Sequence, residues 1–174
     1  MGAWGAIIMS FFGAVFAALT MYWQWRLTGP DLAIPFSIFA AISIAASIVI
    51  RSPGNGIKPS EKIERVIMWS SIGEGIGLFV ISNIVINLHR PDLLLPAMAL
   101  VVGLHFIPIA YVASFRPFYM LGTILILCSL AGVVVGPPTS GVLAGFAAAC
   151  ALWLSSIIAV RRDWQVKRSN LVGI

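Results

Sequence analysis

Residues 93–114 read LLLPAMALVVGLHFIPIAYVAS and contain no Asp, Glu, Lys or Arg. A helix needs roughly 20 predominantly apolar residues to cross the ~30 Å hydrocarbon core of a bilayer. This stretch therefore predicts a transmembrane helix. Charged breaks that contain proline bound it on both sides, Arg90-Pro91-Asp92 before it and Arg116-Pro117 after it, and they mark the connections to the neighbouring segments.

Five further apolar stretches flank this one, and together they predict six membrane spans. Most connections between them are short, so consecutive helices are expected to be antiparallel neighbours. Apolar and small residues occur in all six without strict alternation, unlike the strands of a membrane barrel. The sequence thus predicts an all-α, polytopic membrane protein in which residues 1–174 form a single transmembrane domain, a six-transmembrane-helix bundle. The predicted spans cover about residues 4–23, 33–50, 66–88, 93–114, 118–136 and 142–160.

The composition of the whole chain agrees with a membrane protein. Of its 174 residues, 60% are hydrophobic and 10% are charged, whereas soluble domains are about 45–50% apolar and about 25% charged. A water-soluble globular protein and a disordered chain are therefore excluded. Two cysteines are too few for a disulfide-stapled secreted scaffold.

The basic residues predict the orientation of the chain. Six spans place only Arg26 and Arg90 on one side of the membrane and the other nine on the opposite side. Because short cytoplasmic connections are enriched in Lys and Arg, both termini are expected to be cytoplasmic. The net charge of +5 then indicates contact with anionic lipid, so the lipid bilayer is the expected partner and nucleic acid is not. The nine residues are Arg51, Lys58, Lys62, Arg65, Arg116, Arg161, Arg162, Lys167 and Arg168.

Small residues spaced four apart occur on several of the predicted helices. Such pairs allow close approach of helices in lipid, where apolar burial does not drive association. They favour packing inside the bundle, and a homodimer through small-residue helix faces is the alternative. The pairs are Gly13 with Ala17, Gly73 with Gly77, Gly132 with Gly136, and the series Gly141, Gly145 and Ala149.

Glu74 and His105 are the two ionisable residues deep inside the predicted spans. Ionisable groups in hydrocarbon are costly, so they mark functional sites by default. Glu74 lies eight residues past Val66, about 12 Å into its span, and His105 lies nine residues before Ser114, about 13.5 Å in from the same side. Because a tight turn joins the two helices, the carboxylate and the imidazole are expected to meet at one depth.

The helix that carries Glu74 has polar residues on two faces. Ser70 and Ser71 share the face of Glu74, whereas Asn83 and Asn87 lie roughly opposite. All four are candidates for an ion, proton or ligand site with the Glu74–His105 pair. A helix that is polar on both faces is also expected to occupy a central position in the bundle. Ser60, with Glu61 and Glu64 after it, predicts that this helix begins outside the bilayer.

Two alternatives compete with a functional role for the pair. A buried Glu74 bonded to Ser70, Ser71 or another helix would only fix the packing. Cys128 and Cys150, near mid-membrane, could complete a metal site of mixed ligands with Glu74 and His105. No C-x-x-C, H-x-x-x-H or E-x-x-H spacing supports that site, and lone cysteines usually act as small apolar residues, so no metal or other cofactor is predicted.

The run Gly103-Leu104-His105-Phe106-Ile107-Pro108, with Glu74 one helix earlier, resembles a family of small, uncharacterised bacterial six-helix integral membrane proteins. The resemblance implies a multi-pass protein of the bacterial cytoplasmic (plasma) membrane and no particular activity.

Three classes of function follow from these residues. The first is a small-solute or ion transporter or channel that uses the Glu74–His105 pair. The second is a non-catalytic membrane subunit that binds a small molecule or a partner. The third is an intramembrane metal protein or enzyme, although the chain has no nucleophile elbow, phosphate loop or nucleotide fingerprint. The glycine-rich run 73–77 lies inside an apolar helix rather than after a strand, so it indicates packing.

Overall fold

The computed structural model describes residues 2–56 and 60–172, which form six long helices without a strand. The predicted all-α six-helix bundle is thus confirmed. Short 3₁₀ turns, Gly29–Ala33 and Pro91–Leu93, precede the second and fourth helices. The long helices are α1 (Ala3–Trp25), α2 (Ile34–Arg51), α3 (Glu61–Asn87), α4 (Leu94–Ala113), α5 (Arg116–Val135) and α6 (Ser140–Val172).

All six helices are long and apolar enough to cross a bilayer, and the chain is a multi-pass integral membrane protein. The sixth helix is longer than its predicted span of 142–160. It runs without a break to Val172, because no glycine or proline occurs between residues 146 and 172. With 33 residues it extends about 50 Å, more than the hydrocarbon core requires. The basic residues after Val160 therefore lie on an extension of α6 and not on an irregular tail.

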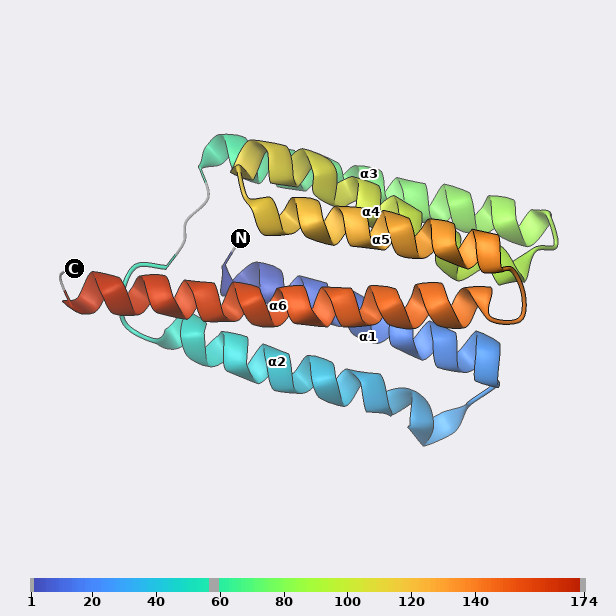
Figure 1. The fold of residues 1–174 in the computed structure, drawn as a ribbon. Helices are drawn as coiled ribbons and strands as arrows, with labels where there is room; N and C mark the ends of the chain where they lie inside the picture. Colours follow the sequence, from blue (N-terminus) through green and yellow to red (C-terminus); the bar gives the residue numbers. More distant parts are fainter. Residues whose placement is uncertain (1, 57–59, 173–174) are drawn as a thin grey trace.

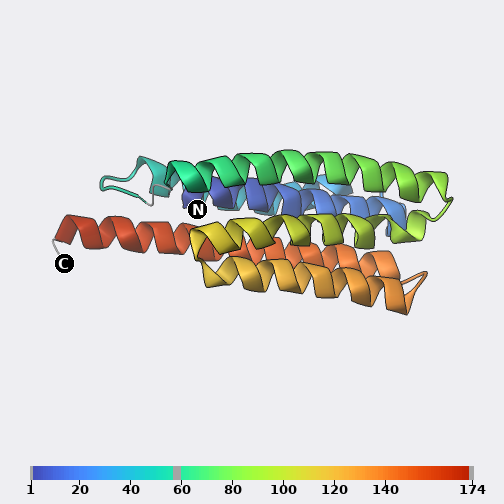
Figure 2. The ribbon, with the colours of Figure 1, turned by 90° about the horizontal axis from the view of Figure 1, so that it is seen from above.

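The helices run roughly parallel to one long axis, with both ends of the chain at the same end of the bundle (Figure 1). The most extensive helix–helix contact is between α1 and α6, and α4 packs against both α3 and α5. Figure 2 shows α3 along one edge of the bundle and α5 along the opposite edge in this view. The buried core lies between α1, α4, α5 and α6, around Phe16, Leu95, Leu125 and Leu152.

The expected central position of the third helix is wrong. This helix, α3, packs chiefly against α4, and its buried residues are Glu74 and Val85. Its second polar face needs no neighbouring helix, because the side-chain amide of Asn83 donates a hydrogen bond to the carbonyl of Phe79 at 2.7 Å within the same helix. Such local bonding satisfies a polar side chain that faces outward.

Small residues of α1, α5 and α6 form contacts inside the bundle. Gly13 packs against the ring of Trp153, and Gly145 packs against Thr20. The indole Nε1 of Trp153 donates a hydrogen bond to the carbonyl of Ser10 at 3.2 Å. A Cβ added at Gly73, by contrast, would have no atom within 4 Å. The α1–α6 glycines therefore serve the fold of one chain.

The extension of α6 binds the ends of two other helices at the basic end of the bundle. The carboxylate of Asp163 accepts a hydrogen bond from the backbone N–H of Ala3 at 3.0 Å, at the start of α1. One turn later, Lys167 Nζ donates to the carbonyls of Val49, Ile50 and Ser52, where α2 ends. Each charge opposes the partial charge of the helix end that it meets. Of the nine residues used for orientation, Lys58 lies outside the described residues.

Candidate functional site

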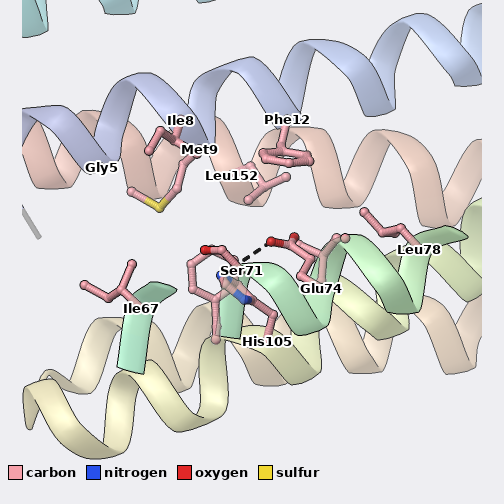
Figure 3. A pocket seen from close by; sticks show the side chains of 13 residues that line it. Gly5, Ile8, Met9, Phe12, Ile67, Ser71, Glu74, Leu78, His105 and Leu152 are labelled. Carbon is pink, nitrogen blue, oxygen red and sulfur yellow. Dashed lines mark ion pairs between the residues drawn. The ribbon is translucent and has the colours of Figure 1, made fainter. Parts of the chain in front are cut away.

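Glu74 of α3 and His105 of α4 lie side by side in the bundle. The imidazole Nε2 and the carboxylate Oε2 are 3.6 Å apart, and only 8% and 9% of the two side chains, respectively, are exposed. Figure 3 shows the two side chains pointing toward each other from adjacent helices. The second ring nitrogen, Nδ1, is buried and has no hydrogen-bond partner among the described residues. The site therefore combines an acid, a base and one free polar atom inside a membrane span.

Two contacts hold α3 against α4 at the level of this pair. The hydroxyl of Ser70 donates a hydrogen bond to the backbone carbonyl of His105 at 3.3 Å. On the other side of Glu74, Gly77 allows close approach, since a Cβ there would fall 2.9 Å from the side chain of Val101. Glycine at a helix contact has this effect in membrane bundles generally.

The turn between α3 and α4 fixes the relative depth of the Glu74 and His105 side chains in the bundle. Arg90 donates from Nε and Nη2 to the two carboxylate oxygens of Asp92, at 3.1 and 2.9 Å. This ion pair raises the pKa of the exposed Arg90 guanidinium. The start of α6 adds a further tie, because the Ser140 hydroxyl donates to the carbonyl of Asp92 at 3.1 Å.

A cavity of about 290 Å³ lies next to the pair, between α1 and α3. Figure 3 shows Met9 and Phe12 of α1 pointing into this space toward α3, with Leu152 of α6 beside Phe12. Its polar side chains are Glu74, His105 and Ser71, and the other lining residues are glycines or apolar. The apolar and glycine lining consists of Gly5, Ile8, Met9, Phe12, Ile67, Gly75, Leu78, Val102, Phe106 and Leu152.

A second cavity, of about 510 Å³, lies at the basic end of the bundle between α1, α3 and the extension of α6. Glu64, Asp163 and Lys167 contribute its charged groups. Both cavities are lined by Gly5, Ile8 and Ile67, so they meet at these three residues. On α3, Glu64, Ile67, Ser71 and Glu74 repeat at helical spacing and face the same side. The two cavities therefore adjoin end to end, and together, from the basic end to the Glu74–His105 pair, they are called the groove.

The other candidate residues from the sequence divide into two groups. Ser71 lines the cavity and Ser70 binds the backbone beside His105. Asn83 and Asn87 are exposed on the remote part of α3, and neither lines the cavity. The residues that the sequence did not indicate are those of α1, among them Met9 and Phe12. They are ordinary apolar residues, and no connection in the chain links α1 directly to α3, so no sequence signal points to them.

The two cysteines considered for a metal site do not join Glu74 and His105. Cys128 is half-buried and Cys150 is exposed, and neither lines the cavity beside Glu74 and His105. Among the described residues, no group of three or more His, Cys, Asp or Glu side chains could hold a metal ion. The pair itself offers one imidazole nitrogen and one carboxylate, which suits proton exchange or a hydrogen bond to a solute better than coordination.

No known family model matches this chain, and no curated protein or solved structure has significant similarity to it.

Proposed function

We propose that this protein is a small membrane transporter or channel for an ion or a small solute, with the Glu74–His105 pair as its proton-sensitive site. The observation that carries the proposal is the position of the pair beside the inner of two adjoining cavities, the outer of which lies at the basic end of the bundle. Intramembrane carboxylate and imidazole groups beside a cavity are the usual elements of proton relays.

The geometry of the pair supports proton exchange. At 3.6 Å, a small movement of either side chain brings Nε2 and Oε2 within hydrogen-bond distance. The free Nδ1 of His105 gives the imidazole a second position for a proton or for a donor group of a solute. The pair can therefore exist in protonation states that differ in charge, and each state binds a passing cation or solute differently.

The composition of the groove supports a path that starts from one side. Its outer part holds the charged groups of Glu64, Asp163 and Lys167, whereas its inner part is apolar except for Ser71 and the pair. We place the basic end, and with it both termini, in the cytoplasm of a bacterial cell, because basic residues favour the cytoplasmic side. The groove then leads from the cytoplasm to the pair.

Proton flux through the purified protein tests this function. The full chain is reconstituted into liposomes with a trapped pH-sensitive dye, and a K⁺ gradient with valinomycin supplies the membrane potential. We expect proton movement in the wild type and a loss of at least about tenfold in Glu74→Gln and in His105→Gln, on the scale of general acid–base groups. Asn83→Ala, a matched polar change on α3 outside the cavity, should retain the wild-type rate.

Two results would contradict the proposal. Wild-type protein that moves no protons above empty liposomes would remove the proton-sensitive role. A Glu74→Gln variant that conducts like wild type would remove the pair from the path. Elution of each variant as a single species in detergent controls for misfolding.

A further inference from the structure

A separate groove of about 560 Å³ lies between α2 and α6. In Figure 1, α2 lies below α6, whereas α3 and α4 lie above it. Ala41, Ile42 and Ala45 of α2 form its apolar wall, together with apolar residues of α6. The polar residues of the groove all belong to the extension of α6, where Arg161, Trp164 and Arg168 occupy successive turns of one face. The groove thus has one apolar half and one cationic half.

The position of the two halves matches the profile of a bilayer. Ala41 lies ten residues before Arg51, the end of α2, which places it about 15 Å along the helix from that end. Arg161 is the first charged residue of α6, and Arg168 lies seven residues, about 10 Å, farther out. The hydrogen bond between Lys167 and Val49 places Arg168 near the end of α2, at the depth of headgroups, and Arg161 about 10 Å deeper, at the boundary with the apolar half.

Among the described residues, no Asp or Glu lines the groove beside these arginines. The neighbouring Asp163 is turned toward the start of α1, where it binds Ala3. The third arginine of this segment, Arg162, lies over the ring of Phe115 at 4.1 Å and is not part of the groove. Arg168 stacks over Trp164 at 5.8 Å, an arrangement that orients its guanidinium.

We propose that this groove is a binding site for an anionic phospholipid. The phosphate lies between Arg161 and Arg168, with Trp164 beside it, and an acyl chain lies along Ala41 and Ala45. Arginine pairs with phosphate through parallel hydrogen bonds, and basic pockets between membrane helices bind anionic headgroups. The volume falls within the ~300–1,000 Å³ range of specific ligand sites. The inference requires only that the helices span a bilayer, and it does not depend on transport.

Native mass spectrometry of the full chain in detergent tests the site. The protein is titrated with phosphatidylglycerol or with phosphatidylcholine that carries the same acyl chains. We expect wild type to prefer phosphatidylglycerol by about 25-fold, since each of the two arginines near the headgroup contributes about fivefold. The variant Arg161→Gln/Arg168→Gln should lose this preference. Arg116→Gln, which removes an exposed charge at the same end outside the groove, should keep it.

A second variant tests the apolar half without changing charge. Ala45→Trp fills the groove between α2 and α6, so it should lower phosphatidylglycerol binding several-fold while the arginines remain. Equal binding of both lipids by wild type, or wild-type binding by the double arginine variant, would overturn the proposal. Unchanged binding by Ala45→Trp would overturn it as well, because the headgroup alone would then be recognised. Unchanged melting temperatures show that the variants remain folded.

Discussion

Lys167 in the extension of α6 donates a hydrogen bond from Nζ to the backbone carbonyl of Val49 at 2.7 Å, across 118 positions of the chain. The same ammonium group also binds the carbonyls of Ile50 and Ser52, each at 3.0 Å. The last turn of a helix leaves its carbonyls without partners inside the helix. A single buried lysine therefore completes the end of α2 and fixes the last helix to the second.

Replacing this lysine is expected to destabilise the protein. Lys167→Met keeps most of the length of the side chain but leaves the carbonyls at the end of α2 without their donor, at a cost of about 1–3 kcal/mol. Lys62→Met removes an exposed lysine on α3 and should change the free energy of unfolding by less than about 0.5 kcal/mol. Denaturant titration in mixed micelles measures both variants. Equal stability of the two would show that the three hydrogen bonds contribute nothing.

The surroundings of two glycines predict opposite effects of their replacement by alanine. At Gly145, an added Cβ collides with the Thr20 side chain across the α1–α6 contact, so Gly145→Ala should destabilise by about 1–3 kcal/mol through overpacking. At Gly73 there is open space around the position. Gly73→Ala should therefore be neutral or stabilise the helix by up to about 1 kcal/mol. Thermal unfolding in detergent compares them, and a neutral Gly145→Ala would contradict the tight α1–α6 contact.

The six helices and the common depth of Glu74 and His105 could be predicted from the sequence. Long apolar stretches, interrupted by Pro, Gly and charged residues, determine where helices lie because the bilayer imposes their length. The short turn at Arg90-Pro91-Asp92 makes α3 and α4 neighbours. Counting residues from the ends of two antiparallel neighbours then brings Glu74 and His105 to one level, and in the structure their side chains are 3.6 Å apart.

Contacts between helices that are distant in the chain could not be derived in the same way. The groove beside Glu74 depends on α1, and its residues Met9 and Phe12 resemble lipid-facing residues in every respect of composition. The central position expected for α3 was wrong because a polar face does not require a neighbouring helix when Asn83 bonds to its own backbone. Asp163 and Lys167 belong to a charged segment that is typical of a solvated tail, and only the structure identifies their partners.

The two members of the pair should act as one unit. If Glu74 and His105 exchange the same proton, removing either one abolishes the exchange, so Glu74→Gln/His105→Gln should conduct no less than each single variant. The effects of substitutions on the rate are strongly non-additive when the residues act together. The liposome assay measures all three variants. A double variant whose loss equals the product of the two single losses would indicate that the residues act independently.

The orientation of the chain predicts which positions a reagent can reach from outside the cell. Thr28, in the connection between α1 and α2, and Ser169, near the end of α6, are exposed and lie at opposite ends of the bundle. In intact cells, with Cys128 and Cys150 replaced by Ala, a membrane-impermeant maleimide should label Thr28→Cys and spare Ser169→Cys. Permeabilised cells should show labelling at both positions. The reverse pattern in intact cells would place the termini outside and contradict the positive-inside assignment.

A bulky side chain where the two cavities meet should close the groove and leave the pair intact. Ile67 lines both cavities, whereas its neighbour Met68 is exposed on another face of α3. Ile67→Trp is therefore expected to lower proton flux by about tenfold or more, and Met68→Trp should have little effect. Both substitutions add a similar volume to adjacent positions, so a general disturbance of α3 would affect them alike.

A labelling measurement shows whether Ile67→Trp lowers proton flux by closing the groove or by another effect. Ser71 lies between Ile67 and Glu74 along the groove. The test uses Ser71→Cys in a chain with Cys128 and Cys150 replaced by Ala. This cysteine should react with a small water-soluble thiol reagent added at the basic end. Ile67→Trp should slow this reaction by the same order as it slows the flux, because both depend on one opening. Reaction of Ser71→Cys that is unaffected by Ile67→Trp would mean that solutes reach the Glu74 region from the lipid or from the opposite end.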